Sequence, residues 1–146
     1  MIKITDALTV EHGLLLAVFE QVESLLPEIS TTEEAERLAR LVEGLLSKHA
    51  DTEDNLVYIT LDHALEQQGK LGELHQEHEE INHFFKEVAS AKTLPEARLL
   101  LKRALKASRA HFASEEHYVF PIIEKALQSE TLVEMGNAWA QKQKAS

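Results

Sequence analysis

The chain of 146 residues contains no cysteine and only 5 glycines and 3 prolines. The absence of cysteine excludes disulfides, thiolate metal ligands and a cysteine nucleophile. Because sheet-rich folds need many tight turns, the scarcity of glycine and proline argues against them. A chain of this length can bury a sizeable core. We therefore expect one domain over residues 1–146.

Basic residues are also few: 15 Lys and Arg stand against 25 Asp and Glu, which gives a formal net charge of −10. This charge repels a phosphate backbone, and no basic run offers an anionic membrane a docking patch. We therefore expect neither a nucleic-acid nor a membrane partner. The first residues lack the pattern of a signal peptide, and no uncharged span is long enough to cross a bilayer. We expect a soluble cytoplasmic protein that is a monomer or a weak homodimer.

Apolar residues recur at helical spacing along four long segments. These cover about 5–26, from a capping box at Ser30 or Thr31 to Gln67, 72–90 and 95–127. Short links join the first to the second and the third to the fourth, so consecutive helices are antiparallel. The second helix is long, so either residues 64–71 fold back or that helix breaks early. Pro121 should kink the fourth helix or restart it. The sequence predicts an all-α, antiparallel up-down four-helix bundle over residues 5–127 and a short tail helix at 129–143.

Histidine is unusually frequent, with eight residues, and its positions follow an internal repeat. Residues 11–22 align with 77–88 at an offset of 66, and residues 49–58 align with 111–120 at an offset of 62. Two matches at nearly the same offset indicate a helical hairpin that occurs twice. Each hairpin provides one histidine from its first helix. Its second helix provides a histidine and a glutamate four residues apart, which share one helix face.

Counting along each hairpin at about 1.5 Å per residue places these side chains at one depth of the bundle. The six residues are His12, His49, Glu53, His78, His111 and Glu115. A single His–Glu pair is more often an ion pair, but burying the whole set without a cation costs several kcal/mol per unpaired charge. Imidazole and carboxylate suit iron, manganese or zinc, and six donors exceed what one tetrahedral zinc needs. We therefore predict two metal ions, with bridging carboxylates and terminal histidines.

A likeness to a known family rests on five motifs: Glu11-His12, His49-x3-Glu53, Glu77-His78, His111-x3-Glu115-Glu116 and Val119-Phe120-Pro121. Over residues 5–127 the sequence resembles the hemerythrin-like (HHE cation-binding) family. The resemblance implies a four-helix bundle with two iron ions, bridged by two carboxylates and an oxo or hydroxo group, with manganese or zinc as substitute ions. It also implies that the four histidines are terminal ligands and that Glu53 and Glu115 bridge.

One departure from that family concerns the position four residues after His78. Oxygen-carrying hemerythrins have a fifth histidine there, whereas this chain has Asn82. His75, one turn before His78, is an alternative fifth ligand or an outer contact. Oxygen carriers also use a His-x4-Asp spacing, which would make Glu116 rather than Glu115 the bridge. The resemblance therefore favours binding, sensing or reducing O2, NO or peroxide in a stress response over carrying oxygen.

Other functions stay open on the sequence alone. The resemblance also covers iron storage, iron homeostasis and repair of Fe–S clusters under nitrosative stress. Any enzymatic activity would be a weak di-iron oxidase or peroxidase reaction. A ferritin-like oxidase needs Glu-x-x-His on two helices, and only Glu80 to His83 fits that spacing. A metal-free signalling bundle that presents one phosphorylatable histidine leaves the duplicated set unexplained.

Several other polar residues lie near the motifs. For Tyr58 and Tyr118, packing is the favoured role over contact with the ligands. His63 is expected on the inner face of its helix, too far along the axis to reach the metal. His83 and His117 are expected at the surface or between helices.

Overall fold

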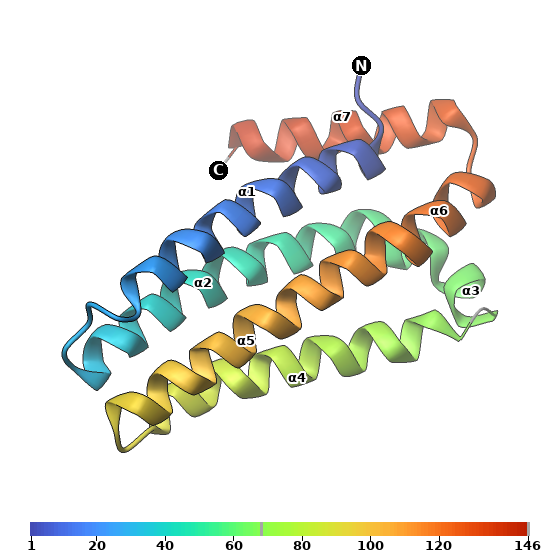
Figure 1. Ribbon diagram of the computed structural model, residues 1–146. Helices are drawn as coiled ribbons and strands as arrows, with labels where there is room; N and C mark the ends of the chain where they lie inside the picture. The colour runs from blue at the N-terminus through green and yellow to red at the C-terminus, as the bar shows by residue number, and fades with distance from the viewer. Residues whose placement is uncertain (68, 146) are drawn as a thin grey trace.

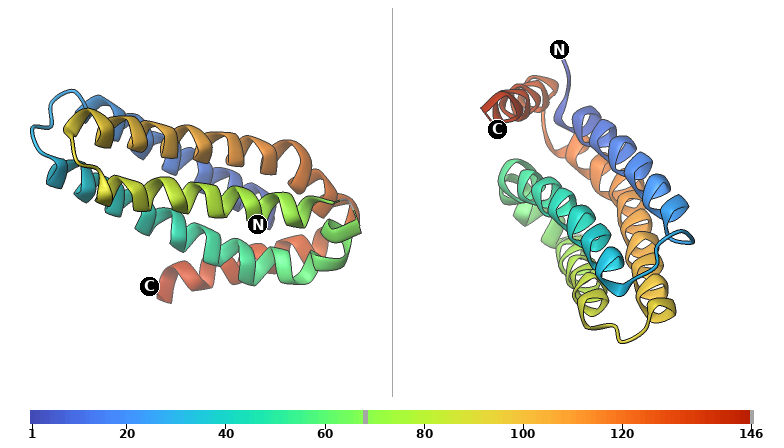
Figure 2. Two further views of the ribbon diagram at one scale, coloured as in Figure 1. Left: turned by 90° about the horizontal axis from the view of Figure 1, so that it is seen from below. Right: turned by 90° about the vertical axis from the view of Figure 1, so that its left-hand side faces the viewer.

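The fold is seen in a computed structural model that describes residues 1–67 and 69–145. Four long helices form the bundle: α1 (Ile4–Leu25), α2 (Thr32–Glu53), α4 (Lys70–Ser90) and α5 (Leu94–Ser114). Figure 1 shows consecutive helices running in opposite directions, and Figure 2 shows them packed side by side from two further directions. Within the described residues no strand occurs. The expected all-α, up-down four-helix bundle is confirmed.

Capping boxes begin the second helix of each hairpin. The Thr31 side chain accepts a hydrogen bond from the Glu34 backbone N–H at 3.2 Å, and Glu34 accepts one from the Ser30 N–H at 2.8 Å. The Thr93 side chain accepts from the Glu96 N–H at 3.3 Å in the same way. Each box satisfies backbone donors that the first turn of a helix leaves unpaired. Thr31, rather than Ser30, is therefore the N-cap of α2.

A π-helical turn interrupts the second helix of each hairpin at the carboxylate of the His–Glu motif. The first, η1 (Asp54–Tyr58), follows Glu53 directly, and the second, η2 (Glu115–Val119), begins at Glu115. The helices then continue as α3 (Ile59–Gln67) and α6 (Phe120–Ala126). Pro121 lies in the first turn of α6, where its missing N–H is tolerated, so the expected restart is found there. Single π turns inside α-helices are frequent at functional sites.

The second helix predicted from the sequence does not run straight to Gln67, because its last part forms the separate helix α3. Figure 1 shows α3 turning away from the axis of α2 towards the start of α4, and α3 packs on α4 and α6. Gly69, before α4, has a φ of 68°, in the left-handed region that glycine adopts without strain. His63 on α3 is exposed and lies 3.0 Å from the side-chain nitrogen of Gln67. Its expected inward position is therefore wrong, because α3 leaves the axis that defined the inner face.

Two apolar clusters fill the bundle. One, around Phe19, Phe85 and Leu101, lies toward the end that carries the two short loops. The other, around Leu8 and Ile123, lies toward the opposite end. Burying one such side chain fully contributes about 1.5–3 kcal/mol relative to exposing it. Between the clusters lies a layer of buried polar side chains: His12, His49, Glu53, His111 and Glu115.

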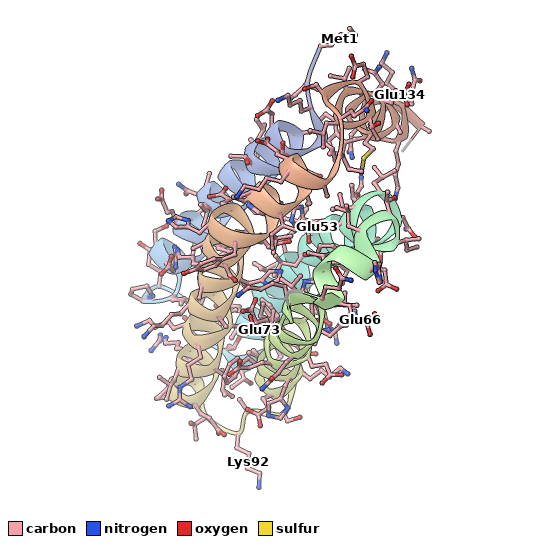
Figure 3. All side chains as sticks on the ribbon, turned by 90° about the vertical axis from the view of Figure 1, so that its right-hand side faces the viewer. Met1, Glu53, Glu66, Glu73, Lys92 and Glu134 are labelled. Carbon is pink, nitrogen blue, oxygen red and sulfur yellow. The ribbon has the colours of Figure 1, made fainter. Side chains whose placement is uncertain are left out.

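Figure 3 shows the position of this layer. Glu53 lies inside the bundle, between Lys92 at one end and Met1 at the other. Dense packing on both sides leaves the polar side chains little freedom to rearrange. The fold therefore holds the candidate site in a rigid frame.

The predicted tail helix is α7 (Ser129–Ala145), which lies beside α1 outside the four-helix bundle (Figure 1). Leu132 is buried in the second apolar cluster. Gly136 lies so close to the N-terminal segment that an added Cβ would sit 2.0 Å from the carbonyl oxygen of Ile2. Within the described part of the chain, no helix combines the length and apolar character needed to cross a membrane.

Candidate metal centre

The six residues singled out in the sequence meet in the polar layer. They come from α1 (His12), α2 (His49 and Glu53), α4 (His78), α5 (His111) and η2 (Glu115). Glu53 and Glu115 are both 0% exposed, and His12 is 1% exposed. Four helices from both repeats therefore present nitrogen and oxygen donors to one buried region.

The histidine rings meet in two pairs through their Nε2 atoms. His12 and His49, from the first hairpin, have Nε2 atoms 3.1 Å apart. His78 and His111, from the second hairpin, have Nε2 atoms 2.8 Å apart. Each pair joins the two helices of its own hairpin. The internal repeat of the sequence thus gives each hairpin one pair of facing histidines.

The two carboxylates lie between these pairs. Oε1 of Glu53 is 2.7 Å from Nε2 of His49 and 3.5 Å from Nε2 of His12. Oε1 of Glu115 is 3.2 Å from Nε2 of His111 and 3.3 Å from Nε2 of His12. Glu115 therefore reaches a histidine of each hairpin. Glu116 instead lies outside the layer, where its side chain is 36% exposed.

The outward-facing Nδ1 atoms of three of these histidines lie close to carboxylates. The pairs are His12 with Glu116 (3.1 Å), His49 with Glu11 (3.4 Å) and His111 with Glu77 (2.5 Å). A carboxylate on Nδ1 favours the tautomer with the proton at Nδ1 and the lone pair at Nε2. Metal-ligating histidines have this arrangement in most sites. The sequence predicts no role of their own for Glu11 and Glu77. Their signal in the sequence is the Glu-His dipeptide, which occurs once in the first helix of each hairpin.

Two further observations show that the donor set fits a metal. The Oε1 atoms of Glu53 and Glu115 are buried, and although histidine Nε2 atoms lie 2.7–3.5 Å away, none of the described residues meets them in the geometry of a hydrogen bond. An unpaired buried carboxylate oxygen is costly. In the Nδ1–H tautomer, the Nε2 lone pairs of each histidine pair face each other and repel unless a proton or a cation lies between them. Cations in the layer would satisfy the nitrogen and oxygen donors together.

The electrostatics of the first hairpin favour positive charge. Burial disfavours the protonated form of His49, but the carboxylates of Glu11 and Glu53 beside its ring outweigh burial and raise the pKa of His49 to about 10. Burial also opposes protonation of His12, yet Glu115 and Glu53 raise the pKa of His12 to about 9. The buried carboxylates therefore attract positive charge, which protons or metal ions can supply.

In the second hairpin, the pKa values of the two histidines shift in opposite directions. Burial opposes protonation of His111, but Glu115 raises the pKa of His111 to about 9. Burial and the neighbouring charge of His111 lower the pKa of His78 to about 4. Burial and the charge of Glu115 raise the pKa of Glu53. Although burial raises the pKa of Glu115, the contacts with the rings of His111 and His12 hold it well below its usual range. His78 is thus the neutral histidine of the set, ready to donate a lone pair.

Tyr58 contacts both carboxylates. Its hydroxyl donates a hydrogen bond to Oε2 of Glu115 and lies 3.4 Å from Oε2 of Glu53. Burial and the charges of the two carboxylates raise the pKa of Tyr58, so the hydroxyl keeps its proton at neutral pH. Tyr58 packs in the second apolar cluster, as favoured from the sequence, but its hydroxyl also contacts the carboxylates of the layer. Tyr118 is 57% exposed, away from the site.

Cavities border the donor residues, and one of them reaches histidines of both hairpins. A cavity of about 230 Å³ reaches His49, His78 and His111, and Asn82 lies on its wall. Phe112 lines the same cavity, and its ring stacks on that of His12, with centroids 4.1 Å apart. Asn82, at the position where oxygen carriers have a fifth histidine, thus borders the cavity that reaches the site.

The remaining histidines lie outside the donor groups. His75 is exposed and lines a different cavity of about 320 Å³ with Asp54 and Tyr58. His83 is exposed and pairs with Glu87 on the same helix at 3.1 Å. His117 is also exposed. The expected surface positions of His83 and His117 are found.

Comparison with protein-family models gives one clear finding. The model of the hemerythrin HHE cation-binding domain matches residues 3–123. This span covers the four-helix bundle and all six residues of the polar layer, and it ends before α7. Comparisons with curated proteins and with solved structures gave no match.

Proposed function

The chain belongs to the hemerythrin HHE cation-binding family, and from this premise we propose that it binds two iron ions and uses them to bind, sense or reduce O2, NO or peroxide. The proposed ligands are His12, His49, Glu53, His78, His111 and Glu115. The observation that carries the proposal is that two groups of metal donors share Glu53. We also propose that residues 1–146 form one domain, since α7 completes the second apolar cluster.

The donor groups support two ions rather than one. The first group contains His12, His49, Glu53 and Glu115, and the second contains Glu53, His78 and His111. Within each group, the donor atoms all lie within 4.8 Å of one another. A carboxylate common to two groups is the usual bridge between metal ions in a helical bundle. Imidazole and carboxylate also suit manganese and zinc, and it is the family likeness that favours iron.

The unequal size of the groups supports a small-molecule reaction. The first group offers four donors, whereas the second offers three. The 230 Å³ cavity reaches His49 of the first group and both histidines of the second. Three protein ligands with an open position are typical of reactive metal sites. Iron bound there would supply redox chemistry and a Lewis acid. The cavity has room for a diatomic molecule or a peroxide, since a water molecule takes about 30 Å³ in the liquid.

The chain itself controls the surroundings of that open position. Asn82 on the cavity wall presents an amide, a poorer ligand than imidazole, and so leaves the position free. Phe112 packs on the ring of His12 and forms an apolar part of the cavity wall. Tyr58 holds a proton beside Glu115. These residues favour the approach of a small ligand from the His78–His111 side.

The test is anaerobic loading with Fe²⁺, followed by metal analysis and separate exposure to O2, NO and peroxide. We expect two iron ions per chain and new near-ultraviolet or visible absorption with at least one of the three. His83→Ala is the matched control, because His83 is an exposed histidine outside both donor groups. It should retain both ions. A wild-type chain that holds one ion or none would exclude the proposal.

A further inference from the structure

The C-terminal helix makes a polar contact with the candidate metal centre. The indole N–H of Trp139 on α7 donates a hydrogen bond to Oε1 of Glu11 at 3.1 Å. The other oxygen of Glu11, Oε2, faces Nδ1 of His49 at 3.4 Å. A continuous chain of contacts therefore leads from α7 through α1 to a donor on α2. The family match ends at residue 123, so α7 lies outside it.

We propose that α7 is part of the metal centre, with Trp139 as a positioning residue that holds Glu11 and, through it, His49. The inference rests on the proposed function, because it needs a metal ion at His49. The carboxylate on a ligating histidine orients the imidazole and increases its basicity. Trp139 occupies one oxygen of that carboxylate and leaves the other to face His49. The docking of α7 thereby sets the affinity and ligand field of the ion bound by the first donor group.

The docking of α7 is specific enough for this role. Leu132, Met135, Gly136 and Trp139 follow helical spacing along one face of α7. Leu132 is 1% exposed, and Met135 and Trp139 pack against the second apolar cluster. Gly136 approaches the backbone of Ile2 so closely that no side chain fits without displacing the helix. These contacts fix how far along α1 the indole of Trp139 lies.

The other half of the repeat lacks this support. Glu77 occupies the position of Glu11 in the second hairpin and contacts Nδ1 of His111 at 2.5 Å. Its side chain is 34% exposed, against 17% for Glu11, and it lines a groove between α4 and α5. The chain contains a single tryptophan, so no equivalent of Trp139 can hold Glu77. The support is therefore confined to the first donor group, and its loss should affect one ion of the two.

The test uses Co²⁺ as the probe, because its visible absorption reports the ligand field and its titration gives stepwise affinities. Trp139→Phe removes the N–H donor and keeps an aromatic ring in the second cluster. Loss of an outer carboxylate costs roughly 10–100-fold in metal affinity, so loss of the group that holds it should cost less, about 3–10-fold. We expect this loss, with a changed visible spectrum, at one of the two Co²⁺ sites. Glu77→Gln is the matched variant and should weaken the other site.

Two more variants separate positioning from general packing. Gly136→Ala displaces α7 without altering any group near the metal, and it should reproduce the weakened site of Trp139→Phe. In a Glu11→Ala background, Trp139→Phe should cause no further loss of affinity, because Trp139 acts through Glu11. Urea unfolding of each variant with chelator present confirms that the bundle is folded.

The measurements distinguish a failure of this inference from a failure of the proposed function. If the wild type binds two Co²⁺ ions and Trp139→Phe keeps both affinities and the spectrum, the inference is wrong. It is also wrong if Trp139→Phe weakens binding equally with and without Glu11, or if Gly136→Ala leaves both sites unchanged. A wild-type chain that binds no Co²⁺ would instead overturn the proposed function, and the inference with it.

Discussion

Tyr58 and Glu115 come from different halves of the repeated hairpin, and they meet in the buried polar layer, where the tyrosine hydroxyl donates a hydrogen bond to the carboxylate. The residue at the position of Tyr58 in the second hairpin is Phe120, which has no hydroxyl. The contact is therefore made once, and it breaks the two-fold likeness of the site. It gives Glu115 a partner in addition to its histidines.

Tyr58→Phe tests this contact. The substitution leaves Oε2 of Glu115 buried without its hydroxyl donor, which should lower the free energy of unfolding of the metal-free protein by about 1–3 kcal/mol. Urea denaturation with chelator present measures the change. Tyr118→Phe, at an exposed tyrosine, should alter stability little. Equal stabilities for Tyr58→Phe and the wild type would contradict the contact.

The carboxylates of the layer and those around it should differ in their effect on metal binding. Glu53→Ala removes the donor that both groups share, so both ions should be lost. Glu116→Gln changes only the group that faces Nδ1 of His12. The affinity for metal should therefore fall roughly 10–100-fold, but both ions should still bind. Metal analysis after gel filtration separates the two results. Glu87→Ala, at an exposed glutamate, should retain the wild-type metal content.

The metal-free protein should be most stable near pH 6.5. The pKa values of His12, His49 and His111 are raised to about 9–10 in the folded protein, so the folded state binds more protons than the unfolded state above pH 6.5. The stability that these histidines contribute is complete below about pH 6.5 and is lost as the pH rises through 9–10. The pKa of His78 is lowered to about 4, so its contribution is lost as the pH falls from about 6.5 to 4.

Urea denaturation between pH 4 and 10 with chelator present measures this profile. Saturating metal should remove the alkaline loss of stability, because metal binding requires deprotonated imidazoles and gains from high pH. Metal at 100 times its dissociation constant should also add about 2.7 kcal/mol per independent site. A metal-free protein whose stability rises steadily from pH 6.5 to 10 would contradict the assignment of these histidines.

Asn82→His tests the open side of the site. Asn82 lies four residues after His78 on α4, so an imidazole there shares its helix face and projects into the 230 Å³ cavity. It should occupy the open position of the second donor group. The reaction of iron-loaded protein with NO or peroxide, followed by stopped-flow absorption, should then slow by about tenfold, which corresponds to 1.4 kcal/mol of added barrier. His75→Ala, in the separate cavity beside Asp54, should leave the rate unchanged.

Much of the bundle was predictable from local pattern. Apolar spacing and the capping box at Ser30 or Thr31 located the helices to within a few residues, because these signals act within one or two turns. The repeat then placed His49 and His111 at matching heights in the two hairpins. The excess length of the second helix was also visible, but the direction in which α3 leaves the axis depends on its packing against α4 and α6.

The details of the site were less predictable. A π turn changes one hydrogen-bond step in a helix and leaves the apolar spacing nearly intact, so η1 and η2 have no clear signature in the sequence. Packing was the favoured role for Tyr58 and is found, but the contact of its hydroxyl with Glu115 depends on how the two hairpins pack. The partners of the Nδ1 atoms depend on where neighbouring helices bring carboxylates such as Glu11 and Glu116.

The sequence by itself determined which histidines and carboxylates are candidate donors and which helices carry them, because residue spacing along a helix sets the face on which a side chain lies. Tertiary structure alone decided which oxygen atoms remain unpaired, which side of the layer opens to a cavity and what holds each imidazole. The contact from Trp139 to Glu11 joins residues 128 positions apart. No local pattern encodes such a distance, since it depends on how α7 packs against α1.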